Sequence, residues 1–189
     1  MTQRGAEHRC GWWVVALVLL APASAVARDP VVAVDNTGSG CDVHGTFQAP
    51  VSGAVAWAVL TDYDHIGEFV RSVRSSRVER REGGKVLLRQ TAVGSVFLFR
   101  RRVEVLLELH EIPGRRIAFH DVLGKDFQSY VGEWRVAADS VGSRVEYDLA
   151  AEPRALPRSF CRGALRKMAR DLLEQVRAEM LRRGAGPRL

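Results

Sequence analysis

Residues 157–183 have the sequence PRSFCRGALRKMARDLLEQVRAEMLRR, and this stretch decides the fold. Its apolar residues recur every three or four positions, which is the spacing of one face of an α-helix. Pro157 near the start and Gly184 just past the end are typical of helix boundaries. Because a helix of about 25 residues must bury its apolar stripe, it needs a large apolar partner surface. The stripe consists of Leu165, Met168, Ala169, Leu172, Leu173, Val176 and Met180.

The preceding residues predict that partner surface, an antiparallel sheet. Seven segments have the composition and alternation of strands, and turn residues separate most of them. Gly94 and Ser95 are expected to form a two-residue hairpin turn. Two short helices, residues 51–60 and 65–70, are expected after the first strand. The expected strands are residues 41–48, 73–80, 85–93, 96–111, 116–122, 127–137 and 144–151.

The predicted fold is of the α+β class. We expect a seven-stranded antiparallel sheet wrapped around the long C-terminal helix, with the two short helices after the first strand. The length and the absence of internal repeats indicate one domain over residues 41–183. Residues 28–40 are expected to form a flexible N-terminal segment, and residues 184–189 a short tail.

The first 27 residues have the features of a secretory signal peptide. A polar head with Arg4 and Arg9 precedes an apolar run of about 11 residues, and Ala25-Val-Ala27 resembles a cleavage site. The run is too short to cross a bilayer as a helix, which takes ~20 residues. We therefore expect residues 1–27 to be removed and the mature protein to be exported to the periplasm.

Basic residues exceed acidic ones, with 28 Lys and Arg against 22 Asp and Glu and a net charge of +6. They are spread along the chain rather than gathered on a recognition helix, which, together with export, argues against a nucleic-acid partner. Two explanations of the positive charge stay open: transient contact with an anionic membrane surface, or solubility alone. A monomer is the expected oligomeric state.

Several segments resemble the START-like (SRPBCC) superfamily, in its polyketide cyclase/dehydrase and coenzyme Q-binding branch. FQAP at 47–50 and VAWAVLTDY at 55–63 are similar to the opening of that fold, whereas FQSYVGEW at 127–134 and RVEYDL at 144–149 resemble its last two strands. The resemblance covers residues 41–183 and implies a helix-grip fold. The branch contains carriers, cyclases and binding modules, and it has no universal catalytic residues. The signal-peptide features depart from many relatives.

A sheet wrapped around a helix leaves a cavity, and strand alternation predicts which side chains line it. Aromatic residues are prominent on the predicted inner face, and a buried phenol hydroxyl needs a hydrogen-bond partner. The candidate ligand-binding residues are Tyr63, Phe69, Gln90, Phe97, Phe99, Arg101, Phe119, Tyr130, Trp134, Tyr147, Met168 and Leu172.

Arg101 has two interpretations. Alternation places it on the inner face, where it would anchor a polar headgroup or a carbonyl. A β-bulge near Arg100 would instead shift the register and turn Arg101 outward.

Catalytic and metal-binding patterns are scarce. His44, His65, His110 and His120 are isolated in the sequence, and no serine lies in a nucleophile elbow. We predict no catalytic residues, no metal and no cofactor. Whether the protein is an enzyme stays open, and a non-enzymatic role is favoured.

Three functions fit these features. The favoured one is a periplasmic carrier or sensor for a hydrophobic small molecule such as a lipid, quinone or polyketide-like compound. The alternative is a polyketide cyclase/dehydratase-type enzyme in which Arg101, Tyr130 or Tyr147 orients a carbonyl. The third is a protein-interaction module whose cavity is filled by its own side chains.

Cys41 and Cys161 are the two cysteines that remain after cleavage. An even number of cysteines in an oxidising compartment permits a disulfide, so we predict that they pair. The pairing requires Cα atoms within about 7 Å of each other.

Cleavage after Ala27 has a direct test. N-terminal sequencing of the protein from the periplasmic fraction of its host should begin at Arg28, because the A-x-A triplet places the cut there. A cytoplasmic protein that begins at Met1 would contradict both the cleavage and the export.

Overall fold

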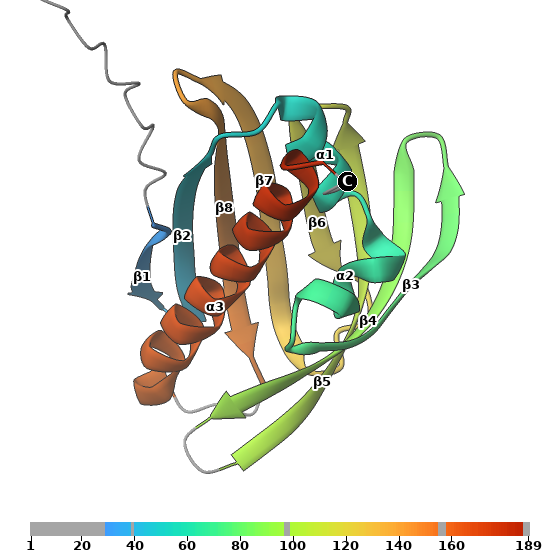
Figure 1. Cartoon of the computed structure of the whole chain (residues 1–189). Helices are drawn as coiled ribbons and strands as arrows, with labels where there is room; N and C mark the ends of the chain where they lie inside the picture. The colour runs from blue at the N-terminus through green and yellow to red at the C-terminus, as the bar shows by residue number, and fades with distance from the viewer. Residues whose placement is uncertain (1–28, 39, 97–98, 155–157, 187–189) are drawn as a thin grey trace, which may run out of the picture.

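The computed structural model describes residues 29–38, 40–96, 99–154 and 158–186, with the side chains of residues 94–101 and 158–161 outside the description. Eight strands form one antiparallel sheet in the order β1-β2-β8-β7-β6-β5-β4-β3, and the sheet curves around the long helix α3 (Figure 1). This is the α+β helix-grip fold that the sequence predicts. The strands are β1 (Val31–Thr37), β2 (Gly40–Ala49), β3 (Val73–Glu82), β4 (Lys85–Val96), β5 (Phe99–Ile112), β6 (Arg116–Asp121), β7 (Phe127–Asp139) and β8 (Gly142–Pro153).

Short helical elements link β2 to β3. Helix α1 (Gly53–Leu60) begins after Ser52, whose hydroxyl accepts a hydrogen bond from the backbone N–H of Val55 at 3.3 Å. Such a cap satisfies one of the N–H groups that a helix leaves free at its start. A 3-10 turn η1 (Tyr63–His65) and helix α2 (Ile66–Phe69) follow, and α3 spans Arg158–Gly184.

The sheet has eight described strands rather than the expected seven. Residues 31–37, expected to belong to a flexible segment, form β1, which pairs with β2 from Val31 opposite Thr46 to Thr37 opposite Gly40. Both the local strand preference of this segment and its packing in the core explain the extra strand. The segment VVAV is rich in β-branched residues, and it buries Val34 to 1% exposure in the core.

The hairpin of β4 and β5 turns later than expected. Gly94 and Ser95 lie within β4 and pair with Arg101 and Arg100, and the last pair of the ladder is Val96 with Phe99. The strand-forming residues around Gly94 extend the ladder, so this glycine marks no turn. The observed pairing differs from the expected one by three residues along each strand, which is six residues in total and an even number. The predicted assignment of side chains to the two faces is therefore unchanged.

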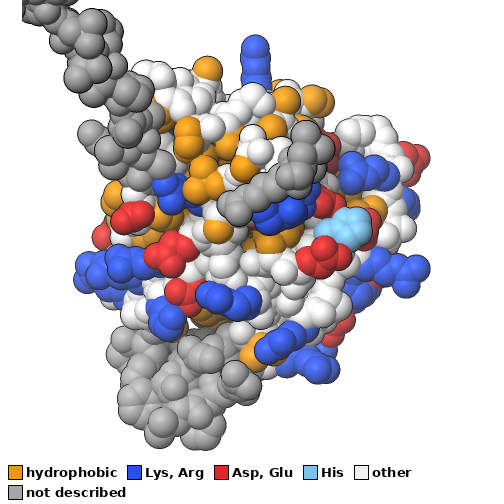
Figure 2. Space-filling model, in the orientation of Figure 1, with side chains coloured by type: hydrophobic (Ala, Val, Ile, Leu, Met, Phe, Trp, Pro, Cys, Tyr) orange, Lys and Arg blue, Asp and Glu red, His pale blue; other side chains and the backbone are white. Residues whose placement is uncertain are grey.

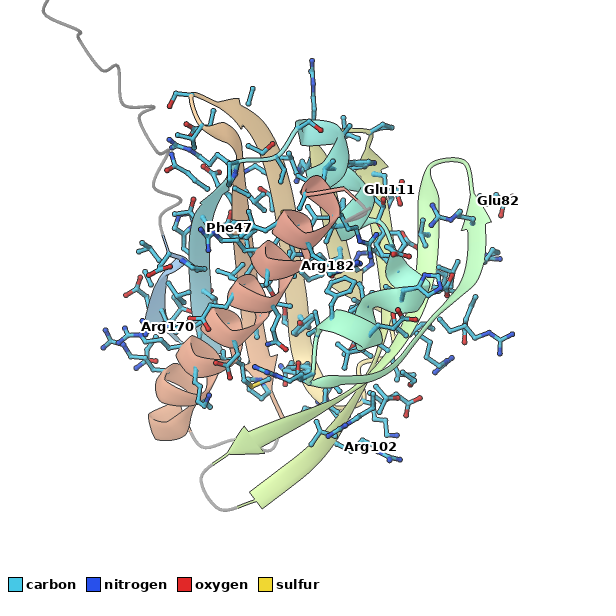
Figure 3. All side chains as sticks on the ribbon, in the orientation of Figure 1. Phe47, Glu82, Arg102, Glu111, Arg170 and Arg182 are labelled. Carbon is cyan, nitrogen blue, oxygen red and sulfur yellow. The ribbon has the colours of Figure 1, made fainter. Side chains whose placement is uncertain are left out.

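Helix α3 packs mainly against one side of the sheet, over β1 and β2. Gly45 of β2 makes this close approach possible, because a Cβ at that position would collide with the side chain of Leu173, which is fully buried. Phe47 lies between β2 and α3, whereas Arg170 projects from α3 away from the sheet (Figure 3). The apolar stripe is thus buried and the charged side of the helix faces solvent.

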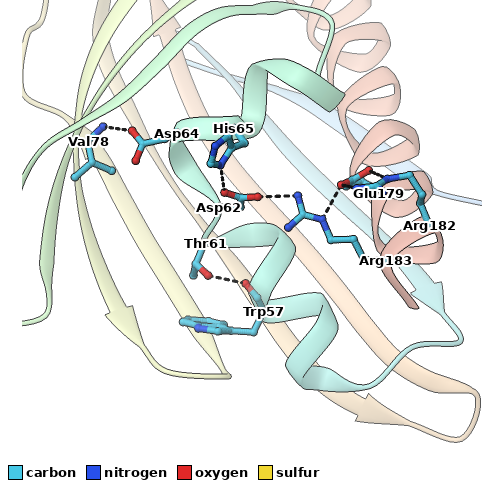
Figure 4. Close-up of polar contacts among 9 residues, drawn as sticks. All are labelled: Trp57, Thr61, Asp62, Asp64, His65, Val78, Glu179, Arg182 and Arg183. Atoms are coloured by element: carbon cyan, nitrogen blue, oxygen red, sulfur yellow. Dashed lines mark hydrogen bonds and ion pairs between the residues drawn. The ribbon is translucent and has the colours of Figure 1, made fainter. Parts of the chain in front are cut away.

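Ion pairs fasten the short helices to the C-terminal end of α3 (Figure 4). Asp62 accepts hydrogen bonds from Arg183 at 2.7 Å and from His65 at 2.6 Å, and Arg183 also donates to Glu179 at 2.6 Å. Burial alone would raise the pKa of Asp62, but the hydrogen bonds from His65 and Arg183 outweigh it and lower the pKa. The Arg183 guanidinium lies 5.7 Å from the ring centroid of Phe69, which extends the contact to α2.

Charged residues cover the outer surface, and on the face in Figure 2 acidic and basic side chains are interspersed. The edge strand β3 exposes Arg74, Arg77, Arg80 and Arg81. Its pairing with β4 has two irregularities, one after Val73 and one after Val78. No helix within the described ranges has the length and apolar content needed to cross a membrane.

Cys41 is a buried free thiol whose S–H donates to the side-chain oxygen of Asn36 at 3.3 Å. Cys161 belongs to α3, but its side chain lies outside the described residues. The Cys41–Cys161 pairing therefore stays a prediction.

The contact of α3 with β2 can be tested by glycine substitutions. Gly45→Val should lower the free energy of unfolding by about 1–3 kcal/mol, because the added methyl groups force Leu173 out of its place. Valine is the better strand former, so a loss of stability has to come from the collision. Urea unfolding followed by circular dichroism measures the change.

Gly163→Ala is the matched control, since a Cβ at Gly163 meets nothing within 4 Å. Alanine in this helix should raise the free energy of unfolding by about 0.5–1 kcal/mol. A Gly45→Val protein as stable as the wild type would show that the helix does not need the close approach.

Candidate functional site

A cavity of about 210 Å³ lies between α3 and the concave face of the sheet. Strands β4 to β8 form its floor, α3 its roof, and α1, η1 and α2 close one end. Most of its lining side chains are aliphatic or aromatic, and none of the described ones is charged. The uncharged polar exceptions are Ser72, Gln90 and the polar atoms of Tyr63, Tyr130, Trp134 and Tyr147.

The structure brings nine of the twelve predicted site residues together around this cavity. Phe97 lies outside the described residues, and so do the side chains of Phe99 and Arg101. The β4–β5 ladder runs without a register shift through Arg102, Arg101 and Arg100, so the β-bulge that would turn Arg101 outward is absent from this described part of the ladder, and the headgroup anchor stays a prediction. The nine lining residues are Tyr63, Phe69, Gln90, Phe119, Tyr130, Trp134, Tyr147, Met168 and Leu172.

Sequence reasoning missed lining residues where the chain is irregular. Ile66, Ser72 and Val73 belong to α2 and its link to β3, where no period of two or 3.6 assigns a face. Phe127 is a different case. Strict alternation would put Phe127 and Tyr130 on opposite faces of the sheet. A register shift between Phe127 and Ser129 instead brings both side chains to the cavity.

Five aromatic rings from β6, β7 and β8 form one wall of the cavity. Their closest described pairs have ring centroids 4.4 Å apart (Trp134 with Tyr147) and 4.7 Å apart (Phe127 with Tyr130). Phe119 bridges the two pairs, and its ring lies over Gly132, where a Cβ would collide with it. The wall therefore depends on a glycine in the middle of β7.

The hydroxyls of Tyr130 and Tyr147 are buried in this wall. Burial raises the pKa of both phenols, and a hydrogen bond between the two hydroxyls adds to the rise at Tyr147 and opposes it at Tyr130. Both groups are neutral at physiological pH.

Tyr63 closes the end of the cavity beneath the short helices. Its hydroxyl donates to Glu111 at 2.8 Å, and the Arg81 guanidinium lies 5.4 Å from its ring centroid. Burial, together with the hydrogen bond to Glu111, raises the pKa of Tyr63. Glu111 lies beside the short helices (Figure 3). The proton of the Tyr63 hydroxyl is thus already used in a hydrogen bond within the protein.

The cavity opens between α2, β4 and the first half of α3. Phe69 on α2, Ala92 on β4 and Leu165 and Met168 on α3 line it but are only half-buried. Helix α2 lies beside α3 and β3 (Figure 1). A molecule that enters the cavity would therefore pass between side chains of these elements.

The described histidine and carboxylate side chains do not line the cavity. His44 is bonded to Asp148, His65 to Asp62 and His110 to Glu108, and none of these residues lines the cavity. The described residues contain no group of three or more His, Cys, Asp or Glu side chains that could hold a metal ion. The chemistry that the described wall offers is apolar contact and hydrogen bonding from neutral groups.

Solved structures share this fold. A protein of Thermus thermophilus matches with a TM-score of 0.67 and 22% identity over 77% of this chain and 99% of its own. The Zhui aromatase/cyclase of a Streptomyces species has a TM-score of 0.67 and 16% identity, covering 78% of this chain and 98% of its own. A STAR-related lipid transfer protein of Xanthomonas axonopodis has a TM-score of 0.67 and 14% identity, covering 82% of this chain and 94% of its own.

Among curated protein sequences no significant match is found. The model of one protein family, described as polyketide cyclase / dehydrase and lipid transport, matches residues 40–183. These residues include every strand from β2 to β8, the short helices and all but the last residue of α3. The chain belongs to the polyketide cyclase/dehydrase and lipid transport family.

Proposed function

We propose that this protein binds a hydrophobic small molecule, such as a lipid, a quinone or a polyketide-like compound, and acts as a carrier or sensor. The observation that carries the proposal is the preformed cavity, whose described wall is apolar and uncharged. Sites for small molecules typically combine such a wall with a few placed polar groups. The family to which the chain belongs includes lipid transport.

The cavity volume sets the size of the ligand. About 210 Å³ is less than the ~300–1,000 Å³ of sites for drug-sized ligands. A compact molecule with one or two rings suits the cavity as it stands, and a longer chain would extend through the opening beside α2. Each buried CH₂ group of such a ligand contributes about 0.8 kcal/mol.

We place this function outside the cytoplasm, on the strength of the signal-peptide features of residues 1–27. A periplasmic carrier that contacts an anionic membrane surface would account for the excess of basic residues.

A polyketide cyclase would use the same cavity, and the Tyr130–Tyr147 pair could stabilise charge that develops on a carbonyl oxygen. Turnover separates this alternative from a carrier. An interaction module with a filled core is not favoured, because the core of this protein contains a cavity.

Filling the opening tests the proposal. Ala92→Phe should weaken binding of 1-aminonaphthalene, an uncharged two-ring dye whose fluorescence responds to apolar sites, at least tenfold. The reason is steric, since Ala92 lines the cavity on β4 and a phenyl ring there occupies ligand space. Phenylalanine is a good strand former, so the fold should be retained. A fluorescence titration gives the Kd.

Val93→Phe is the matched control. Val93 is the next residue of β4 and does not line the cavity, because neighbouring strand residues point to opposite faces. Its Kd should equal that of the wild type. Equal Kd values for Ala92→Phe and the wild type would show that the dye binds elsewhere and would remove the support for this cavity.

A second measurement asks what the cavity holds in the cell. Native mass spectrometry of protein purified from its own host should show an additional mass that organic solvent removes. An empty protein that also fails to bind any hydrophobic probe would contradict the carrier function.

A further inference from the structure

Two phenols occupy one wall of the cavity. Tyr147 of β8 lies directly opposite Trp134 of β7, and Tyr130 precedes Trp134 by four residues, so alternation places both tyrosines on the concave face. The Phe119 ring packs against both, with centroids 5.9 Å from Tyr130 and 6.4 Å from Tyr147. Both tyrosines line the cavity.

This pair of hydroxyls has one hydrogen-bond donor that a bond between them does not use. Each phenol hydroxyl carries one proton to donate and lone pairs to accept. A hydrogen bond between the two hydroxyls can use only one of their two protons, so one phenolic proton remains. Neither hydroxyl has another hydrogen-bond partner within the part of the chain that the structure describes. A donor that faces an apolar cavity is costly unless an acceptor reaches it.

Two other polar groups of the wall are already engaged. The Tyr63 hydroxyl donates to Glu111 at 2.8 Å, and the Gln90 amide donates to the Ser76 hydroxyl at 3.0 Å. The spare proton of the tyrosine pair is therefore a donor that is free for a ligand in the aromatic wall.

The charge of the wall restricts the ligand further. None of the described lining residues is charged. A carboxylate or ammonium group inside the cavity would lose its hydration without gaining an ion-pair partner, which is strongly unfavourable. A ligand group at the tyrosine pair should therefore be neutral and should accept a hydrogen bond.

We propose that the Tyr130–Tyr147 pair selects neutral apolar molecules that carry a carbonyl oxygen, which accepts the spare phenolic proton. Ketones, quinones and esters have this chemistry. A hydrocarbon gains no hydrogen bond, and an ionised acid is rejected by its charge. This inference rests on the proposed binding function, and it names the chemical class that the same cavity takes.

Three probes of nearly equal shape test the inference. They are 2-acetonaphthone, its hydrocarbon counterpart 2-isopropenylnaphthalene, and 2-naphthoate, with Kd values measured at pH 7 from the quenching of tryptophan fluorescence. The wild type should bind the ketone about three- to tenfold more tightly than the alkene, as expected for one net hydrogen bond. It should bind the naphthoate at least tenfold more weakly than the ketone.

The decisive variant is the double substitution Tyr130→Phe with Tyr147→Phe. Both positions must change, because removing one phenol frees the other to donate. The variant should bind the ketone and the alkene equally, and its unchanged affinity for the alkene shows that the cavity is intact. Val131→Phe is the control, since Val131 is the exposed neighbour of Tyr130 on β7 and does not line the cavity, and it should keep the preference for the ketone.

The outcomes separate this inference from the binding function itself. Equal affinity of the wild type for ketone and alkene, or a ketone preference that survives the double substitution, would overturn the role of the tyrosine pair while leaving a binding protein. Naphthoate binding as tight as that of the ketone would overturn the requirement for a neutral ligand. If no probe binds the wild type, the proposed function fails and this inference with it.

Discussion

The structure depends on where one long helix can approach a wider sheet. Gly45 lets Leu173 come against β2, so α3 packs over β1 and β2 rather than over the middle of the concave face. The sheet extends beyond the helix by several strands, and apolar side chains of α3, among them Met168 and Leu172, line the cavity between the helix and those strands. The cavity is the space left by this off-centre packing. The position of the helix thus creates the site, and the short helices beside it control its opening.

The aromatic wall shows how the sheet uses that space. Flat rings on β6, β7 and β8 support one another, and Gly132 makes room for Phe119. Because rings held by their neighbours lose little freedom when a ligand binds, a ligand that meets this wall meets a surface already ordered. An apolar ligand gains from buried area, whereas the choice among apolar ligands has to come from the few polar atoms in the wall.

Periodic features of the sequence predicted most of the architecture. The stripe of α3 and the alternation of the strands predicted the fold and seven of the nine lining residues, whereas Tyr63 and Phe69 were predicted from their place near the short helices. An even shift of the β4–β5 pairing left the two faces as predicted. Features that do not follow helical spacing or strand alternation were not predicted. Strand β1 owes its order to pairing with β2, the link through Ser72 has no regular structure, and a bulge reversed Phe127. These outcomes depend on tertiary contacts that no local pattern contains.

The arginines of β3 bear on how copies of this chain meet one another. An edge strand presents unpaired backbone groups, and a flat apolar edge would pair with the same edge of a second molecule and join the two sheets. Strand β3 instead exposes four arginines against the acidic Glu79 and Glu82, so two such edges repel each other. Its two irregularities also twist the backbone away from a regular ladder. Strand β3, whose first residue lines the ligand cavity, therefore also opposes association of two molecules through this edge.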